Sequence, residues 1–257
     1  MSDSRKLVQQ QFGRHAERYV NSSDHSRGES LDRLLALAAP RRAWRVLDIA
    51  TGGGHTALAF APHVESVIAS DLTPEMLRAA RKFIREKGHT HVRFAAADAG
   101  ALPWTEGAFD LVTCRVAPHH FADCGAFVRE MFRVLKTGGV AAMIDNVVPE
   151  DPAAADYINA FEKLRDPSHQ RALTDAEWLR VFEHVGFEIQ HRELFRKPRG
   201  FEFWSDMQGL DAATKVRLQQ MLLAAPPPAR AALAPEYTAG GKLQFYLTEL
   251  LLIAIRL

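Results

Sequence analysis

The chain has 257 residues, of which 47% are apolar and 25% are charged, and its formal net charge is +1. This length and composition are typical of a globular protein with one sizeable core, so we expect a single domain over residues 1–257. A charge so close to zero, without a basic tail, creates no field that would attract nucleic acid or an anionic membrane, and we expect neither partner.

The two ends of the chain carry no predicted signal or membrane-spanning segment. The N-terminal MSDSRKLVQQQFGRHAERY has no apolar centre, and the longest apolar stretch, YLTELLLIAIRL, is short and contains Glu249. We therefore expect a cytoplasmic protein.

From residue 45 onward, short apolar strands alternate with amphipathic helices. One expected helix begins at His55, and two more span residues 74–87 and 123–135. Thr73 would cap the start of the helix over residues 74–87, and Gly88 follows its end. The expected strands are WRVLDIA, VESVIASD, HVRFAAAD, FDLVTCRV and GGVAAMIDNV. This alternation predicts βαβ units and a parallel sheet.

Beyond residue 148 the alternation is interrupted by two insertions, residues 149–173 and 196–243. Between them lie a helix that opens with a capping box of Thr174 and Glu177, and a strand around FEIQHREL. Because ligands of open α/β sheets bind outside the carboxyl ends of the strands, we expect the insertions to form a cap over the ligand.

The stretch VLDIATGGGHTALAFA passes from a strand through three glycines into a helix. Gly52, Gly54 and Ala57 formally fit the dinucleotide fingerprint G-x-G-x-x-G/A, so an NAD-dependent oxidoreductase is one interpretation. The same tight turn suits S-adenosylmethionine. The carboxylate of Asp48 would repel a pyrophosphate and attract an ammonium and a sulfonium, which favours S-adenosylmethionine.

Two more acidic residues follow the next two strands. Asp71 is placed to accept hydrogen bonds from ribose hydroxyls, which both candidate cofactors possess. Asp98 could accept from the adenine amino group, with the Ala99 backbone beside the ring. Together they predict an adenosine site.

With these motifs in order, the chain resembles the class I S-adenosylmethionine-dependent methyltransferases, in the methyltransferase type 11 branch with the ubiquinone/menaquinone-biosynthesis C-methyltransferases. The matching motifs are VLDIATGGG, IASDLTPEML, AAADAGALPWTEGAFDLVTCRVAPHHF and EMFRVLKTGGVAAMID. The resemblance implies an α/β fold with a Rossmann-like, doubly wound, seven-stranded and mostly parallel sheet, an antiparallel last strand and a helical cap.

The resemblance also implies S-adenosyl-L-methionine as the cofactor. It implies that a helix within residues 1–30 closes over the site, with Phe12 and Tyr19 facing it. One departure is Ala50-Thr51, where the family usually has Gly-Cys. The residues expected to bind the cofactor are Tyr19, Asp48, Ala50, Thr51, Gly52, Gly54, Asp71, Leu72, Met76, Asp98, Ala99 and Arg115.

Methyl transfer from a sulfonium needs alignment and exclusion of water rather than a covalent residue. If the acceptor must lose a proton, His119 and His120, which follow the fourth strand, are the candidate bases. Alternatively, one histidine packs under the loop and the other forms a hydrogen bond with the backbone. Cys114 and Cys124 flank this pair, but their spacing fits no standard zinc finger, and we expect no metal.

The first insertion contains the substrate candidates Arg165, His169 and Arg171, which could form an anion-binding corner with Arg115. The alternative is a set of surface ion pairs with Asp166 and Glu162. Aromatic residues of the insertions could line an apolar pocket, although we expect at least half to be core of the cap. They are Tyr157, Phe161, Phe201, Phe203 and Trp204.

We therefore predict a methyltransferase that acts on carbon, oxygen or nitrogen of a small molecule. The amino-methylation motif N-P-P-Y or D-P-P-Y is absent, since the fourth strand is followed by CRVAPHH. The alternatives are an NAD-dependent oxidoreductase and a non-catalytic S-adenosylmethionine-binding module. The sequence leaves the acceptor and the oligomeric state open.

Overall fold

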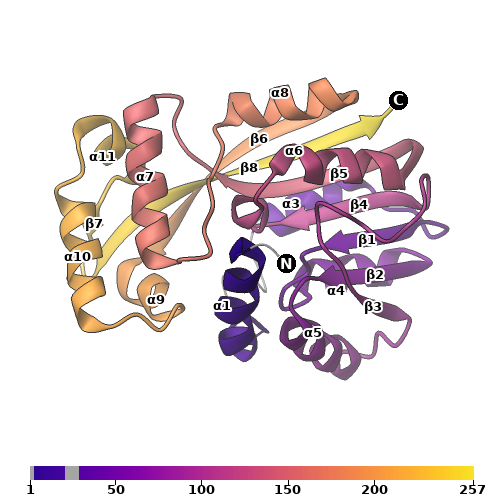
Figure 1. The fold of residues 1–257 in the computed structure, drawn as a ribbon, viewed down its shortest axis with the longest axis horizontal. Coiled ribbons are helices and arrows are strands. Elements are labelled where there is room, and N and C mark those ends of the chain that lie inside the picture. Colours follow the sequence, from indigo (N-terminus) through magenta and orange to yellow (C-terminus); the bar gives the residue numbers. More distant parts are fainter. Residues whose placement is uncertain (1–2, 21–28) are drawn as a thin grey trace.

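The computed structural model describes residues 3–20 and 29–257, except the side chains of residues 3, 4, 14–17 and 19. In these residues an eight-stranded sheet lies between helices, with the strand order β3-β2-β1-β4-β5-β8-β6 and β7 paired to β8 (Figure 1). None of the helices in this part of the chain combines the length and the apolar character needed to cross a membrane.

The first five strands of the sheet run parallel, and β8 lies antiparallel between β5 and β6. The predicted fold is thus confirmed, with the two-residue β7 as an addition to the seven expected strands. The strands are β1 Arg45–Ile49, β2 Ser66–Asp71, β3 Val92–Ala96, β4 Phe109–Arg115, β5 Leu135–Val147, β6 Phe187–Gly200, β7 Glu236–Tyr237 and β8 Leu243–Arg256.

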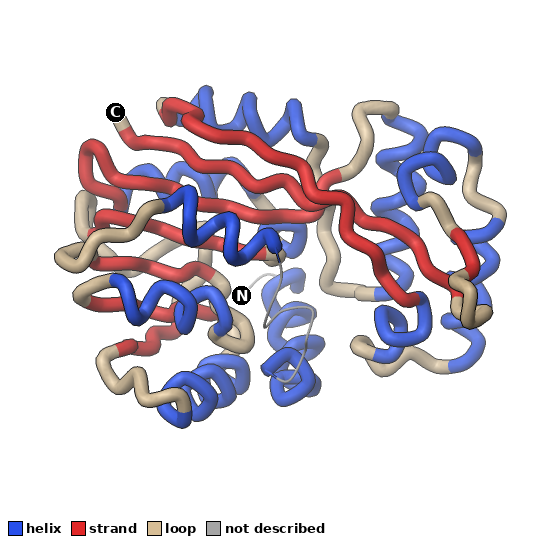
Figure 2. Tube along the Cα trace, turned by 180° about the vertical axis from the view of Figure 1, so that it is seen from behind, coloured by secondary structure: helices blue, strands red, loops and turns tan. Residues whose placement is uncertain are grey.

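Helices lie on both faces of the sheet (Figure 2). Apolar side chains pack them against it in two separate clusters. On one face, α6 and α8 contribute Phe127 and Trp178, and on the other face α3, α4 and α5 contribute Leu34, Phe60 and Ile84. The helices outside the cap are α1 Asp3–Val20, α3 Glu29–Ala38, α4 His55–Phe60, α5 Pro74–Glu86, α6 Cys124–Val134 and α8 Asp175–Val185, with the 3-10 turns η1 Ala61–His63 and η2 Pro118–His120.

The helix ends follow most of the local signals. The capping box is confirmed, because the Thr174 hydroxyl accepts from the Glu177 N–H at 3.2 Å and the Glu177 carboxylate accepts from the Thr174 N–H at 2.8 Å. Thr73 does occupy the N-cap of α5, but its hydroxyl makes no capping hydrogen bond. Its backbone N–H instead donates to Asp71, at 2.8 Å.

The two insertions contain a helical cap with a core of its own. Its helices are α7 Pro152–Arg165, α9 Phe201–Asp206, α10 Ala212–Leu223 and α11 Pro227–Leu233. β6 and β8 continue out of the main sheet into this cap, paired from Phe187↔Arg256 to Gly200↔Gln244 (Figure 1). The cap is therefore joined to the sheet by a hydrogen-bonded ladder rather than by a loose linker.

The aromatic residues of the insertions form the core of the cap. Phe161, Phe201 and Trp204 are buried there, and the rings of Phe161 and Trp204 stack with centroids 4.9 Å apart. Phe203 is 47% exposed, and the Tyr157 hydroxyl donates to the Met221 carbonyl. The prediction that these residues line an acceptor pocket is wrong for the three buried rings, and the alternative of cap core is confirmed for them.

Gly54 and Gly88 allow a matched test of packing, because both have a φ of 86°. A Cβ at Gly54 would lie 2.8 Å from Cδ1 of Ile84 and 3.1 Å from Cβ of Ala80, whereas a Cβ at Gly88 would meet nothing within 4 Å. We expect Gly88→Ala to lower the free energy of unfolding by about 1–2 kcal/mol because of its left-handed backbone. Gly54→Ala should cost about 1–3 kcal/mol more, because α4 and α5 must also separate. Urea denaturation measures both, and equal losses would contradict the packing argument.

Candidate active site

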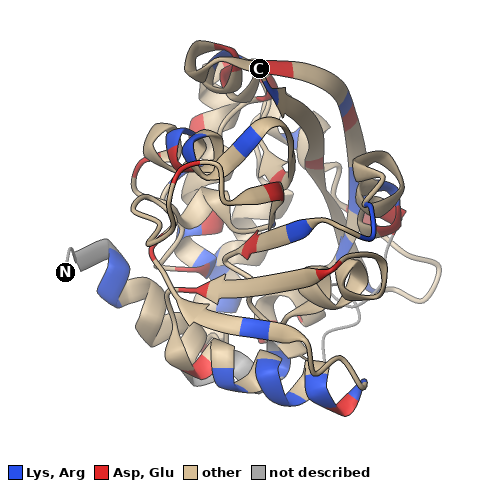
Figure 3. Cartoon of the chain, turned by 90° about the vertical axis from the view of Figure 1, so that its right-hand side faces the viewer, with Lys and Arg blue, Asp and Glu red and all other residues tan. Residues whose placement is uncertain are grey.

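A cavity of about 380 Å³ lies at the carboxyl ends of β1 to β4. The strand order reverses between β1 and β4, and a doubly wound sheet opens a crevice at such a point. Acidic positions lie at the tips of neighbouring strands, on the side where α1 lies (Figure 3). The predicted residues that line the cavity are Phe12, Ala50, Thr51, Gly52, Asp71, Leu72, Met76, Asp98, Ala99, Arg115 and His120.

The loop after β1 is held in shape by the carboxylate of Asp71. One oxygen of Asp71 accepts from the Gly52 N–H at 2.9 Å, and the other accepts from the Thr73 N–H at 2.8 Å. Gly52 has a φ of 54°, which suits a residue without a side chain. Burial raises the pKa of Asp71, against these hydrogen bonds. A carboxylate has about four acceptor positions, and the N–H groups of Gly52 and Thr73 take one on each oxygen of Asp71.

Asp48 supports this loop from beneath and does not line the cavity. It is 1% exposed and accepts hydrogen bonds from the hydroxyls of Thr51 at 2.5 Å and Thr113 at 2.7 Å, and from the N–H of Ala57. Burial outweighs these donors and raises the pKa of Asp48 to about 6. The prediction that its charge meets the ligand directly is therefore wrong, because its oxygens are used inside the protein.

Gly54 also lies outside the cavity lining. It precedes α4 with a φ of 86°, and the space beside it is filled by α5. Its role is thus close helix packing, and the prediction of a direct cofactor contact is revised.

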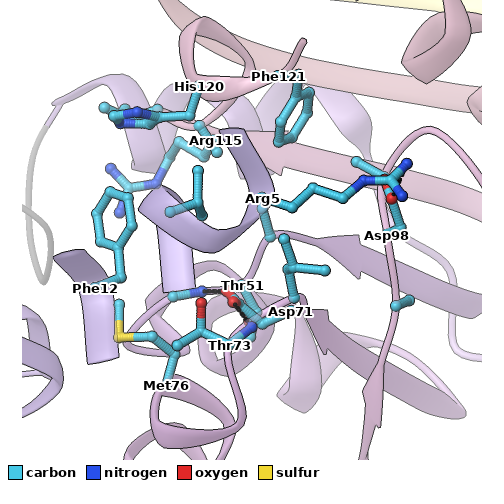
Figure 4. A pocket seen from close by; sticks show the side chains of 18 of the residues that line it. Arg5, Phe12, Thr51, Asp71, Thr73, Met76, Asp98, Arg115, His120 and Phe121 are labelled. Atoms are coloured by element: carbon cyan, nitrogen blue, oxygen red, sulfur yellow. Dashed lines mark hydrogen bonds and ion pairs between the residues drawn. The ribbon is translucent and has the colours of Figure 1, made fainter. Parts of the chain in front are cut away.

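Helix α1 covers one side of the cavity (Figure 4). Arg5 forms an ion pair with Asp98 at 2.5 Å, and the Gln9 amide donates to the Leu72 carbonyl at 2.8 Å. Phe12 lines the cavity, as predicted, while the side chain of Tyr19 lies outside the described residues.

Sequence reasoning missed Arg5, although a signal was present. Arg5, Val8 and Phe12 are spaced three and four residues apart, which puts them on one face of a helix, and all three line the cavity. The other acceptor on Asp98 is used locally, since it accepts from the Gly100 N–H at 2.9 Å. A ligand that reaches Asp98 therefore meets a carboxylate that already accepts from Arg5 and from Gly100.

Arg115 extends from the end of β4 into the cavity, at the end opposite Asp98 (Figure 4). Its Nε donates to the Thr56 hydroxyl at 3.1 Å. Burial lowers the pKa of Arg115, and the charges of Glu249 and Asp48 act against that shift. The cavity thus has a cationic end at Arg115 and carboxylates at Asp71 and Asp98.

The adjacent His119 and His120 have different surroundings. His120 lines the cavity, whereas His119 lies behind it with its Nδ1 2.6 Å from Asp145 Oδ1. Burial opposes the charged form of His119, but the charge of Asp145 and its hydrogen bond raise the pKa of that ring above its ordinary value. Burial, together with the charge of His119, lowers the pKa of His120 to about 3. His120 is therefore the histidine that can meet a ligand.

The three substrate candidates do not form a corner with Arg115, because none of them lines the cavity. Arg165 lies in the cap, where its guanidinium stacks 4.5 Å from the Trp204 ring centroid and lies 3.8 Å from Glu162. Nε2 of His169 lies at hydrogen-bond distance from Oδ1 of Asn159, 2.8 Å away. Arg171 is paired with Glu177 at the surface, at 2.6 Å. The alternative of surface ion pairs holds only in part. Arg165 does lie near the expected Glu162, but inside the cap, and Arg171 at the surface pairs with Glu177 instead.

The described residues contain no group of three or more His, Cys, Asp or Glu side chains arranged to hold a metal ion. Cys114 is buried, Cys124 is half-buried, and both are free thiols.

Comparison with known proteins gives consistent matches. A family described as methyltransferase domain matches residues 46–139. The uncharacterized methyltransferase YcgJ of Bacillus subtilis is 39% identical over 78% of this chain and 79% of that protein. A Bacillus halodurans protein, described provisionally as a methyltransferase, has a crystal structure with a TM-score of 0.85 and 38% identity, covering 89% of this chain and 99% of that one. The demethylmenaquinone methyltransferase of Thermus thermophilus is 40% identical over 48% of this chain and 56% of that protein.

The hydrogen bond from Thr113 to Asp48 predicts a stability loss that depends on pH. The unfolded carboxyl ionises near 3.8 and the folded one near 6, so the contribution of Asp48 to stability falls as the pH rises through this window. Thr113→Val removes a donor to the ionised form and should raise the folded pKa further. We expect it to cost about 1–3 kcal/mol more at about pH 8 than at about pH 5, measured by urea denaturation.

Thr113→Ser is the matched control, because it keeps the hydroxyl. Its cost should be the same at both pH values, and a pH-independent cost for Thr113→Val would contradict the assignment.

Proposed function

The chain belongs to the class I S-adenosylmethionine-dependent methyltransferases and is related to the ubiquinone/menaquinone-biosynthesis C-methyltransferases, and from this premise we propose that it methylates a small molecule. We further propose that S-adenosylmethionine occupies the cavity at the carboxyl ends of β1 to β4. The observation that carries this is Asp71, fixed by the N–H groups of Gly52 and Thr73 at the cavity wall.

The residues present fit such a ligand. The carboxylate of Asp71 would accept from the two ribose hydroxyls, and that of Asp98, next to its ion pair with Arg5, from the adenine amino group. At the other end of the cavity, the Arg115 guanidinium suits the carboxylate of the methionine half. When bound, S-adenosylmethionine supplies a methyl group on a positively charged sulfur.

The walls of the cavity near His120 favour a largely apolar acceptor. Phe12, Val116 and Phe121 line this region, and the Phe12 ring lies edge-on to the His120 ring with centroids 5.0 Å apart (Figure 4). Among the relatives, one is named for the methylation of demethylmenaquinone. We propose an acceptor of similar character, a small apolar ring that carries an ionisable hydroxyl.

The protein's own tasks in the reaction follow from these positions. The apolar walls and α1 exclude water from the cavity, and the wall residues orient the acceptor. His120 accepts the proton that the acceptor must lose, since its neutral ring is the histidine at the cavity.

Removing the carboxylate of Asp71 should abolish the adenosine site. We expect Asp71→Ala to weaken binding of S-adenosylhomocysteine at least ~100-fold, because two hydrogen bonds to a charged group are lost. Calorimetric titration measures this, and Asp156→Asn, which alters an exposed carboxylate on α7, should bind as the wild type does. Binding of NAD without S-adenosylhomocysteine would refute the proposed cofactor.

Catalysis is tested by incubating the protein with S-adenosylmethionine labelled in its methyl group and with hydroxylated aromatic acceptors, reduced demethylmenaquinone among them. We expect label in at least one acceptor. If the protein binds S-adenosylmethionine but transfers no label to any acceptor of this class, the proposed acceptor is wrong. The same result would favour a non-catalytic binding module.

A further inference from the structure

A buried segment of the cap packs directly behind His120. Backbone N–H groups of Gln170 and Arg171 donate to the His119 carbonyl, at 2.9 and 3.1 Å. The same segment carries Asp166 and Ser168, which are 2% and 0% exposed. A segment far away in sequence is thus attached to the turn that presents His120 to the cavity.

A chain of hydrogen bonds runs from this segment to the His120 ring. Ser168 Oγ lies 3.1 Å from Nδ1 of His120, and its hydroxyl donates to Asp166 Oδ1 at 2.6 Å. The other oxygen of Asp166 accepts from the Gln208 amide at 2.7 Å. Asp166 Oδ1 also accepts from the Ser168 N–H at 2.8 Å, so the carboxylate is held on both sides.

The protons available along these hydrogen bonds determine which nitrogen of the His120 ring is protonated. Ser168 has one hydroxyl proton, and an ionised Asp166 can only accept, so that proton points to Asp166. Burial opposes ionisation, but the pKa of Asp166 is lowered, and the hydrogen bonds from Ser168 and the charge of Arg165 favour the ionised form even beside a neutral His120. At the 3.1 Å contact Ser168 must therefore accept, and Nδ1 of His120 must carry the proton.

The neighbouring ring keeps His120 neutral. His119 is paired with Asp145 at 2.6 Å, and the centroids of the two histidine rings lie 4.2 Å apart. A second positive charge on His120 would be repelled by a protonated His119 at this distance. A neutral ring with its proton on Nδ1 has an available lone pair on Nε2.

We propose that Asp166 and Ser168 are positioning residues that hold His120 as the Nδ1–H tautomer, which leaves Nε2 as the base that receives the acceptor's proton. This inference rests on the proposed function. The O–H bond of the acceptor breaks, its proton passes to Nε2, and the electron pair stays on oxygen and attacks the methyl carbon. The bond from that carbon to the positively charged sulfur would break as the new bond forms, with its electron pair left on sulfur, so that S-adenosylhomocysteine is the leaving group. A weak base is sufficient, because the hydroxyl becomes strongly acidic as the new bond forms.

The tautomer can be measured without any ligand. In the full chain labelled with ¹⁵N-histidine, long-range ¹H–¹⁵N correlation distinguishes the two nitrogens of each ring, and His120→Gln assigns the signal. We expect wild-type His120 to be neutral at about pH 7 with its proton on Nδ1. Ser168→Ala should move that proton to Nε2, whereas Ser168→Thr should retain the wild-type pattern.

Ser205→Ala serves as a matched control, because Ser205 is also 0% exposed in the cap but bonds only the Glu202 carbonyl among the contacts described. It should leave the His120 signal unchanged. Wild-type His120 with its proton on Nε2, or an identical tautomer in Ser168→Ala, would overturn the proposal whether or not the protein transfers methyl groups.

Kinetics provide a second readout once an acceptor is known. Ser168→Ala should lower kcat about 10- to 100-fold while the KM for the acceptor changes less than about twofold, and Ser168→Thr should recover most of kcat. The Nδ1–H signal together with failure of cofactor binding would refute the proposed function and leave the tautomer assignment standing. Unchanged kcat in Ser168→Ala would refute a catalytic role for the hydrogen bonds that join Asp166, Ser168 and His120.

Discussion

The buried carboxylate of Asp48 is the interaction on which the cavity depends. It joins β1 to β4 through Thr113 and β1 to α4 through Ala57, so it connects the two strands between which the sheet reverses direction. It also holds Thr51, whose neighbour Gly52 donates to Asp71 at the end of β2. A buried charge is tolerated only where donors surround it, and here those donors are the parts that shape the loop. The ligand-facing geometry is thus fixed from inside the protein rather than by the residues that touch the ligand.

The fold and most of the cavity at the strand ends were predictable because their signals are local. Glycines and acids at strand ends mark the loop whatever the distant chain does, and Asp71 and Asp98 both line the cavity. The role of Asp48 was not predictable, since nothing in its sequence neighbourhood distinguishes a carboxylate that faces a ligand from one that faces Thr113. The anion-binding corner failed for a related reason, because the partners of Arg165 and Arg171 depend on how the cap folds. Ser168 was missed because its partner is 48 residues away.

The two adjacent histidines show that tertiary contacts can shift the pKa values of identical side chains in opposite directions. His119 faces Asp145 and holds a proton more tightly than a free imidazole, while His120 faces the cavity and Ser168 and holds one less tightly. Each ring contributes to the state of the other, since the charge of His119 disfavours a charge on His120. The pair therefore divides into one ring whose charged form is favoured by Asp145 and one neutral ring at the cavity. The two neighbours differ because the turn after β4 contacts two separate parts of the protein. Asp145 of β5 faces His119, and Ser168 of the cap faces His120.

The long ladder of β6 and β8 has a mechanical consequence. Both strands are 14 residues long and paired along almost their whole length, so the ladder resists bending. The cap lies at one end of this ladder and the main sheet at the other. Within the ladder, Leu250 of β8 is the register partner of Asp145 in β5. Any tilt of the cap must bend or twist this ladder, and its displacement decreases toward the stretch in which β8 is also paired with β5, from Val140↔Ile255 to Val147↔Thr248. Asp145 lies within that doubly paired stretch, so the carboxylate beside His119 is held in place independently of the orientation of the cap.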